Sequence, residues 1–419
     1  MKIKILLIAG MCISTSAFAG GYRVALQGQQ ATGMGHASVA MTDSAEVVFF
    51  NPASMSSLEK SAYFSTGISL INSSTKYQNA LTNSTAETNN PTGTPLYLYY
   101  SRKFDQKISY GLAIYTPYGN SVEWEKDWVG SHLVNNISLK TISVQPTISY
   151  KVNNMVSIGG GPTYINGQVE FNRNLTSSLI DENRDRSNVN IEGSGFTTWG
   201  YNVGLLLKPS APLAVGVNYR SRSDLKAKGE TAHFNNIQNS LETTYPAETA
   251  FDAKLVLPAE LTVGVAYDLN KITTMAVDIN RTFWSAYKNL NIEFETGLTS
   301  YNPRNYEDAN VYRIGIQHKL NGNLTVRAGA YYDNSPIQEG YYAPETPRND
   351  SKGLTAGASF KMSKNLDFDV SFLYLMFNEF SGSYDYVDHK SETTTPDTSF
   401  GGDYISTVTA WGFGLNYKY

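Results

Sequence analysis

The side chains that most often perform catalytic or metal chemistry are scattered through this 419-residue chain. The five histidines are His36, His132, His233, His318 and His389. No two of them have the spacing that a metal site uses. Ser131 and His132 are adjacent, which on a strand would turn them to opposite faces, and His389 lies in a polar segment. Because no nucleophile, base and orienting acid can be placed together, we expect that the protein is not an enzyme and holds no metal.

The last segment of the chain is the clearest structural element, because large apolar residues occupy every second position. These residues are Trp411, Phe413, Leu415, Tyr417 and Tyr419, and between them lie Gly412, Gly414, Asn416 and Lys418. Successive side chains of a strand point to opposite faces, so one face suits lipid and the other a polar interior. This pattern is typical of a strand in an outer-membrane β-barrel. An edge strand of a soluble sheet is the alternative.

The N-terminal segment has the features of a secretory signal peptide. Two lysines precede a mostly apolar run over residues 5–13, and Ala17-Phe18-Ala19 forms a small-x-small cleavage signal. We expect cleavage after residue 19 and export to the outer membrane of a Gram-negative cell. Cys12 is the only cysteine and would be lost with this segment, so the mature chain is predicted to contain no disulfide.

Composition favours membrane strands over membrane helices. The chain carries 29 tyrosines, 18 phenylalanines and 34 glycines. After the N-terminal segment, no run approaches the roughly 18 to 20 apolar residues of a spanning helix. Helices and closed barrels are the two ways to satisfy backbone polar groups in hydrocarbon, so this exported chain is predicted to be a barrel. The formal net charge of −4 is mild, and we expect no nucleic-acid partner.

Alternating or apolar segments bounded by turn residues can be counted along the chain. They begin near Ser61, Pro95, Ile108, Ile137, Met155, Phe196, Leu213, Leu255, Ile272, Ala309, Asn323, Gly353, Asn365 and Tyr404. Very short turns and long polar loops connect them in alternation, as in outer-membrane barrels. The count predicts an all-β fold, a 14-stranded antiparallel transmembrane β-barrel, in one domain.

The faces of the predicted strands indicate what the lumen is like. In two segments, polar or small residues alternate with apolar ones, which predicts a polar lumen there. The stretch 370–377 differs, because either face carries several apolar side chains, among them Leu373, Leu375 and Phe377. Apolar surface inside a barrel suits a hydrophobic ligand. Packing against a plug or a loop is the alternative.

The segment before the first strand has the composition of a compact loop. It is rich in glycine, it contains Asn51-Pro52-Ala53, and it does not alternate. Its length and turn chemistry suit a plug that folds into the lumen. The chain is therefore divided into a signal peptide over residues 1–19, an N-terminal hatch over residues 20–58 and an outer-membrane barrel over residues 59–419.

Several motifs in this segment resemble a known family. The motifs are Gly33-Met34-Gly35-His36-Ala37, Asp43-Ser44-Ala45 and Asn51-Pro52-Ala53. They are similar to the hatch of the long-chain fatty acid transporter family of Gram-negative outer membranes, whose relatives also carry toluene-type hydrocarbons. Shorter matches follow in order along most of the chain, among them Tyr110-Gly111-Leu112-Ala113 and Trp284-Ser285-Ala286-Tyr287. The resemblance implies a fourteen-strand barrel with an N-terminal hatch.

The resemblance also implies passive transport. Hydrophobic ligand would bind at the outer loops, move to a pocket inside the barrel and leave sideways into the bilayer through an inward kink of the third strand, after the N-terminus of the hatch rearranges. Such diffusion needs no ATP and no other cofactor. Pro117-Tyr118-Gly119 gives an independent reason for a kink, because proline removes a ladder donor and glycine permits a bend. The alternative is that Pro117 only ends the strand.

A fatty acid also needs a partner for its carboxylate, and the resemblance assigns that role to basic residues facing the pocket. Phe171 stands about where a base is expected, and Arg173 lies two residues on, which places it on the same face. Arg304 is the second candidate, since arginine suits carboxylates. The expected ligand-binding residues are Phe171, Arg173, Arg304, Leu373, Leu375 and Phe377. A solvated arginine at the barrel rim is the alternative, and a neutral apolar substrate stays open.

These features predict an uptake channel for hydrophobic small molecules. Long-chain fatty acids are the expected ligand and aromatic hydrocarbons the alternative. A general diffusion porin would have an open aqueous lumen, against which the hatch-like segment argues, and an adhesin or receptor would need only the loops. We expect a monomer surrounded by outer-membrane lipid, inserted by the barrel assembly machinery through its C-terminal strand.

Overall fold

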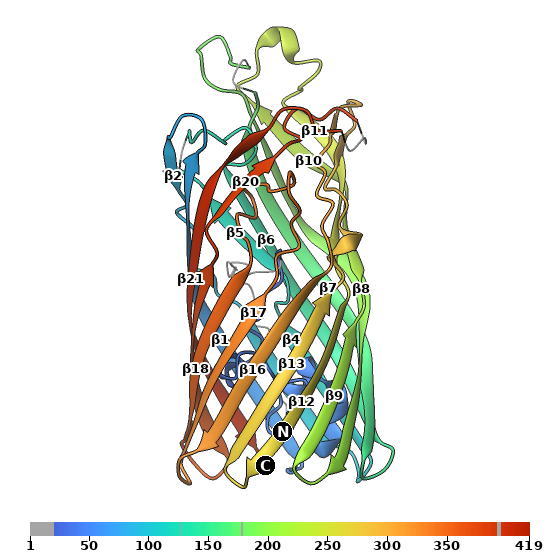
Figure 1. Ribbon diagram of the computed structural model, residues 1–419. Coiled ribbons are helices and arrows are strands. Elements are labelled where there is room, and N and C mark those ends of the chain that lie inside the picture. The colour runs from blue at the N-terminus through green and yellow to red at the C-terminus, as the bar shows by residue number, and fades with distance from the viewer. Residues whose placement is uncertain (1–20, 126, 177–178, 392–394) are drawn as a thin grey trace.

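The protein is a closed antiparallel β-barrel of fourteen strands, as Figure 1 shows. The computed structural model describes residues 21–125, 127–176, 179–391 and 395–419. Neighbouring strands follow one another around the barrel, and the first and last strands close it over a continuous register from Tyr63–Lys418 to Asn79–Gly402. The predicted fold class is confirmed. The predicted signal peptide, with Cys12, lies outside the described residues.

The strands differ widely in length. The barrel strands are β1 (Ala62–Asn79), β3 (Leu96–Lys103), β4 (Ile108–Tyr115), β6 (Asn136–Lys151), β7 (Val156–Asn174), β8 (Asn188–Ser210), β9 (Leu213–Arg220), β12 (Glu260–Asn270), β13 (Thr273–Thr282), β16 (Ala309–Lys319), β17 (Leu324–Asp333), β18 (Ser351–Lys361), β19 (Leu366–Phe377) and β21 (Phe400–Lys418). The other strands are β2 (Thr85–Glu87), β5 (Gly119–Glu123), β10 (Ser223–Asn235), β11 (Glu248–Leu257), β14 (Ile292–Phe294), β15 (Thr299–Ser300) and β20 (Phe380–Tyr384). The helical segments are α1 (Gln29–Gly33), α2 (Val47–Phe50), η1 (Pro52–Ser57), η2 (Asn239–Leu241) and η3 (Trp284–Ala286).

Most predicted strand starts lie close to the observed ones, but the sixth does not. β8 begins at Asn188, well before the predicted start at Phe196. Gly193 and Gly195 in between have the composition of a turn. Gly195 instead adopts a φ of +79° inside the strand, next to a register shift in the pairing of β7 with β8. It is therefore a β-bulge rather than the end of the element.

The outer face of the barrel is apolar and the inner face is largely polar. On β16, Tyr312, Ile314 and Ile316 are exposed, whereas Arg313 and Gln317 are buried in the interior. The same alternation holds on β21, where the large residues from Trp411 to Tyr417 are exposed. Such an inverted surface is stable only where lipid replaces water on the outside. Among the described residues, no helix has the length and apolar character needed to cross a membrane.

The segment before β1 fills the lower half of the barrel, where Figure 1 shows it as blue coils inside the ring of strands. We call residues 21–58 the hatch. Its helix α1 contacts β17, β18, β19 and β21, while η1 contacts β3, β4, β6, β7 and β8. The hatch therefore reaches several sides of the barrel wall, and nearly all of its residues are buried.

Asn51-Pro52-Ala53 ties the hatch to the wall. The side-chain oxygen of Asn51 accepts a hydrogen bond from the amide of Ala53 at 3.2 Å, which caps η1. Its Nδ2 donates to the carbonyls of Val39 and Leu205 at 2.9 and 3.0 Å. One buried amide thus satisfies three backbone groups, two in the hatch and one in β8.

Gly33 and Gly35 let the hatch backbone lie directly against the wall. Gly35 has a φ of +63°, which favours glycine. A Cβ at Gly35 would lie 2.9 Å from the amide nitrogen of Ala330, and one at Gly33 would lie 3.0 Å from the Cα of Gly357. Side chains at these positions would force the hatch away from β17 and β18.

Candidate functional site: an apolar cavity above the hatch

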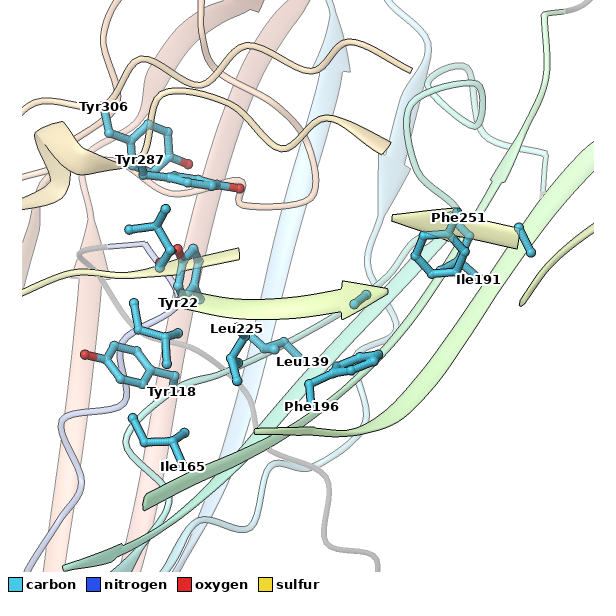
Figure 2. Close-up of a cluster of buried hydrophobic side chains, with 14 of the residues drawn as sticks. Tyr22, Tyr118, Leu139, Ile165, Ile191, Phe196, Leu225, Phe251, Tyr287 and Tyr306 are labelled. Atoms are coloured by element: carbon cyan, nitrogen blue, oxygen red, sulfur yellow. The ribbon is translucent and has the colours of Figure 1, made fainter. Parts of the chain in front are cut away.

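A cavity of about 120 Å³ lies between the hatch and the outer loops. Its apolar lining comes from β6, β7, β8, β10 and β11 and from the loop that carries β14. These residues are Leu133, Ile137, Leu139, Val169, Phe171, Ile191, Phe196, Leu225, Phe251, Leu255, Leu290 and Ile292. Several of them form the buried cluster drawn in Figure 2. A hydrophobic ligand that enters the cavity would therefore transfer its apolar surface from water to an apolar environment, which is favourable.

One boundary of the cavity is a group of aromatic rings that includes the first described hatch side chain. Tyr22 meets Trp284 and Tyr287 edge-on at ring distances of 5.0 and 5.6 Å, and Tyr287 meets Tyr306 at 5.1 Å. Figure 2 shows Tyr22 between Tyr287 and Tyr118. The Tyr22 hydroxyl donates to the carbonyl of Val256. Movement of the hatch N-terminus would therefore open this side of the cavity.

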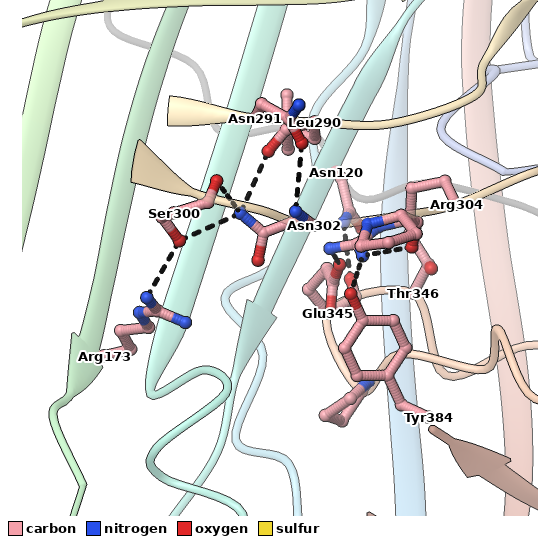
Figure 3. A network of polar contacts seen from close by, with 12 residues as sticks. Asn120, Arg173, Leu290, Asn291, Ser300, Asn302, Arg304, Glu345, Thr346 and Tyr384 are labelled. Atoms are coloured by element: carbon pink, nitrogen blue, oxygen red, sulfur yellow. Dashed lines mark hydrogen bonds and ion pairs between the residues drawn. The ribbon is translucent and has the colours of Figure 1, made fainter. Parts of the chain in front are cut away.

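The outer end of the cavity is polar and holds two arginines, the buried Arg304 and the half-buried Arg173, both shown in Figure 3. Arg304 forms an ion pair with Glu345 and donates to the Tyr384 hydroxyl at 3.0 Å. Burial alone would lower the pKa of Arg304, but the adjacent Glu345 carboxylate outweighs it and raises that pKa. Arg304 is therefore charged and already neutralised.

Arg173 has a different environment from that of Arg304. Its guanidinium donates to the Ser300 hydroxyl at 3.0 Å, and among the described residues it forms no ion pair. Ser300 is held by Asn302, whose Nδ2 donates to its hydroxyl at 3.0 Å. A hydroxyl cannot neutralise a partly buried cation. Arg173 therefore carries charge that an incoming anion could balance.

The third barrel strand is interrupted next to this cavity. β4 ends at Tyr115, which lies opposite Ser143, and its continuation β5 starts at Gly119, opposite Lys140. Between these two pairs, the third strand contains one residue more than the facing segment of β6. The extra residue makes the third strand bulge. The pairing of β3 with β4 stops at Tyr97–Tyr115. Among the described residues β5 has a strand ladder to β6 alone, although the carbonyl of its last residue, Glu123, accepts from the Asn89 amide at 2.8 Å. The wall is therefore open beside β5.

The hatch N-terminus occupies the place of the missing strand partner. The amide of Val24 donates to the Pro117 carbonyl at 2.8 Å, and the amide of Gly119 donates to the Tyr22 carbonyl at 2.9 Å. In addition, Gln27 Nε2 donates to the carbonyl of Thr116 at 2.7 Å. These bonds satisfy backbone groups that a membrane environment cannot satisfy.

The structure brings three of the six expected ligand-binding residues together. Phe171, Arg173 and Arg304 line the cavity. Leu373, Leu375 and Phe377 do not line it; they point inward from β19 and belong to a buried cluster with Val24 and Leu26 of the hatch. The apolar inner face of β19 thus packs against the plug, which was the stated alternative. Pro117, Tyr118 and Gly119 lie at the interruption of the third strand.

Sequence reasoning missed most of the loop residues that complete the site. Ser300, Asn302, Glu345 and Tyr384 come from outer loops and extensions, and Tyr22 comes from the hatch. The one sequence feature that these residues share is that aromatic and polar residues recur in the segments of the long outer loops. That signal does not specify which loops fold back into the lumen.

The predicted absence of a metal site and of a catalytic group can be compared with the described residues. No group of three or more His, Cys, Asp or Glu side chains there could hold a metal ion. The Ser131 hydroxyl accepts a hydrogen bond from Arg186 at 2.8 Å, and the His132 ring packs on Phe400 at 5.4 Å. The two adjacent residues thus contact different neighbours.

Comparison with known proteins agrees with this architecture. A family model described as "Outer membrane protein transport protein (OMPP1/FadL/TodX)" matches residues 10–419. The long-chain fatty acid transport protein of Escherichia coli O6:H1 is 23% identical, with 99% of this chain and 97% of that protein covered. A FadL homologue from Pseudomonas aeruginosa has a similar fold, with a TM-score of 0.82 at 18% identity over 95% of this chain and all of that one. The Pseudomonas putida toluene transporter TodX gives 0.71 at 18% identity over 94% and 98%.

Proposed function

Because this chain belongs to the OMPP1/FadL/TodX family of outer-membrane transport proteins, we propose that it takes up long-chain fatty acids by passive diffusion. The protein is an outer-membrane β-barrel transporter of hydrophobic compounds, and its family consists of transporters and channels rather than enzymes. The closed β1–β21 pairing places the whole route within one chain, so a monomer is sufficient.

The observation that carries the proposal is an unpaired cation at the end of an apolar cavity. A fatty acid has an apolar chain and one carboxylate. Apolar lining residues such as Leu139 and Phe251 suit the acyl chain of the fatty acid, and Arg173 suits its carboxylate. Arg304 is the weaker candidate, because Glu345 already neutralises it and would repel a second carboxylate. Arg173 is therefore assigned as the carboxylate-binding residue, and Phe171 as a contact for the apolar chain.

The proposed route leads from the cavity to the bilayer through the interruption of the third strand. Tyr22 borders the cavity, and the residues that follow it bind Thr116 and Pro117. Displacement of this short segment would open both the cavity and the wall beside β5. The cost is the loss of a few hydrogen bonds, each with a net worth of about 1 kcal/mol, which ligand binding can offset.

Aromatic hydrocarbons are the second candidate, and the size of the cavity favours them. At about 120 Å³, it is close to the ~150 Å³ of an engineered apolar cavity that binds benzene. A toluene-sized ligand would need little rearrangement, whereas a long acyl chain would need the cavity to extend, as hatch movement would allow. The TodX protein, titled a toluene transporter, has the same fold.

Uptake of labelled oleate and labelled toluene tests the proposal. Cells that lack their own transporter would be complemented with this chain or with an empty vector. Uptake of oleate above the vector level is the expected result. Uptake of toluene alone would replace the fatty acid by an aromatic hydrocarbon as substrate, and uptake of neither, with free passage of small sugars, would contradict both.

A further inference from the structure

The barrel wall has a second interruption, between β8 and β10. The pairing of β8 with β9 ends at Asn202–Arg220, and the pairing of β8 with β10 begins only at Ile191–Ala232. Between these points β10 pairs with β11 on its other side. In this described part of the chain, residues 192–201 of β8 therefore have a backbone ladder to β7 alone.

Serine side chains take the place of part of the missing ladder. The amide of Ser221 donates to the Tyr201 carbonyl at 2.9 Å, and the Ser221 hydroxyl accepts from the Tyr201 amide at 2.9 Å. The Ser223 hydroxyl donates to the Trp199 carbonyl at 3.1 Å. Beyond Trp199, the two strands have no hydrogen bond until Ile191 within these described residues.

A small pocket lies at these serines. Gly200, Tyr201 and Ser223 line it from the interruption, and Pro117 and Tyr118 line it from the kink of the third strand. Its free volume of about 10 Å³ is about that of one water-sized sphere, so it is not an open passage in this structure. It nevertheless joins the second interruption to the kink of the third strand.

Apolar side chains, rather than strands, separate this interruption from the ligand cavity. The Leu225 side chain of β10 packs against β7, where a Cβ on Gly167 would be 2.8 Å from a methyl of Leu225. Leu225 and Phe196 are both buried and both line the cavity, and Figure 2 shows them close to Leu139. A change of rotamer at two side chains costs far less than breaking a ladder of hydrogen bonds.

The position of the interruption suits exchange with the outer leaflet. Trp199 and Tyr201 are 64% and 51% exposed on the outer face of β8, directly above the apolar Val203. Exposed aromatic residues at the end of an apolar band mark the interface between lipid and water. An amphipathic ligand concentrates at that depth.

We propose that the β8–β10 interruption is a second lateral port, through which a hydrophobic ligand passes between the outer leaflet and the cavity. Phe196 and Leu225 form its inner gate, and the contacts of Ser221 and Ser223 with β8 form its outer gate. The port rests on the proposed function, since it serves the same cavity and the same ligands. It differs from the kink in its strands and in needing no movement of the hatch.

A disulfide across the outer gate tests the port. A Cβ at Gly200 would lie 2.6 Å from Ser223 Oγ, so Gly200→Cys with Ser223→Cys is within the reach of a disulfide. Cys12, the single cysteine, is replaced by Ala in all variants. The control pair is Ala328→Cys with Ala356→Cys, two outward-facing partners in the intact ladder of β17 and β18.

Uptake of labelled oleate and toluene is measured with each pair oxidised and reduced. Oxidation of the gate pair is expected to lower uptake at least about threefold, with recovery on reduction, while the control pair shows no change. Complete cross-linking with unchanged uptake would overturn the port and leave the proposed function intact. Absence of uptake in the reduced variants and in the parent chain would overturn the proposed function, and with it the port.

A second pair of variants keeps the test decisive if the disulfide does not form. Phe196→Ala is expected to raise the uptake rate, and Phe196→Trp to lower it. A photoreactive fatty acid supplied in the membrane should label peptides that contain Trp199 or Tyr201. Equal uptake by both variants, with labelling confined to residues 116–119, would contradict the port.

Discussion

Arg173 and Arg304 lie at the same end of the cavity, but their partners differ. Glu345 neutralises Arg304, whereas Ser300 gives Arg173 a hydrogen bond and no charge. A cation that is removed from water without a counter-ion destabilises the folded protein. Binding of an anion next to such a cation would remove part of this cost in free energy. This difference distinguishes a structural arginine from one that is available to ligand.

Arg173→Met tests this assignment in a binding assay with the purified barrel. A hydrogen bond to a charged group contributes about 1.5–3 kcal/mol, so we expect oleate to bind about 10- to 100-fold more weakly and toluene to bind unchanged. Lys226→Met, on the exposed side of β10, is the matched control for the loss of one positive charge. Equal weakening of both ligands would show that Arg173 shapes the cavity instead of binding a carboxylate.

Arg348 is another buried arginine, in the loop between β17 and β18. Nη1 is buried and has no hydrogen-bond partner, and burial lowers the pKa of Arg348 to about 10. Because this pKa is below the ordinary value, the charged form destabilises the folded loop at neutral pH. The penalty is complete below about pH 10 and fades only as the pH rises beyond it.

Arg348→Met is therefore expected to make the barrel more resistant to heat at pH 7.5, because the variant no longer buries a charge without a partner. The loss of the compact, heat-modifiable species on gels is the measurement. The gain of the variant over the parent chain should shrink as the pH rises above 10. A variant that is less stable than the parent at pH 7.5 would show that Arg348 has a partner.

At the scale of elements, the hatch N-terminus and the third strand act as one unit. The strand leaves the wall over Thr116–Tyr118, and the hatch supplies backbone partners to that segment. A kink without these partners would expose unsatisfied groups to lipid, and without the kink the N-terminal part of the hatch would lose its hydrogen bonds to the third strand. Gate and opening therefore depend on each other.

Deletion of Pro117 tests whether the opening is needed. β4 and β5 together carry one residue more than β6 over this interval, so the deletion would let the third strand run without a bulge. We expect a folded barrel with uptake lowered at least about tenfold. Unchanged uptake by a folded, membrane-inserted variant would show that ligand leaves by another path.

Asn51→Leu tests how the hatch is held. The change removes a hydrogen bond from three backbone groups, and for the two buried ones, the Val39 carbonyl and the Ala53 amide, the loss costs about 1–3 kcal/mol each. We expect the hatch to become sensitive to protease added on the periplasmic side, while the barrel stays intact. Gln106→Leu, in the exposed turn between β3 and β4, is the control. A hatch as resistant as that of the parent chain would contradict the anchoring role.

Sequence patterns predicted the barrel strands well because alternation and turn composition are local properties. The outward aromatic face from Trp411 to Tyr417 is one example. The same patterns placed the start of β8 at Phe196, because a bulge at Gly195 and a turn have the same local composition. Whether β10 pairs with β8 or leaves the wall depends on contacts such as that of Leu225 with Gly167, which lie far apart in the sequence.

The cavity was only half predictable for a related reason. The spacing of Phe171 and Arg173 on one strand puts both on the inner face. The inner face of β19, with Leu373 and Leu375, has an equally suitable composition, but the hatch covers it. Composition indicates that a face is apolar, and the packing of the whole molecule decides whether a ligand or the plug covers it.

At the scale of the whole molecule, the barrel combines a closed lumen with an interrupted wall. The hatch fills the inner half of the barrel (Figure 1), and buried side chains of the outer loops, such as Arg304 and Glu345, cover the cavity. The wall is interrupted beside β5 and between β8 and β10. This combination favours sideways passage of apolar molecules over axial passage of ions, which separates the protein from a general porin.

We expect hydrophobic compounds to cross this barrel while ions do not. Ion conductance of the purified protein in planar bilayers, compared with oleate uptake by complemented cells, tests this directly. The expected result is low conductance together with uptake above that of the vector control. Large, steady conductance in the bilayer with no uptake of oleate or toluene by the cells would contradict it.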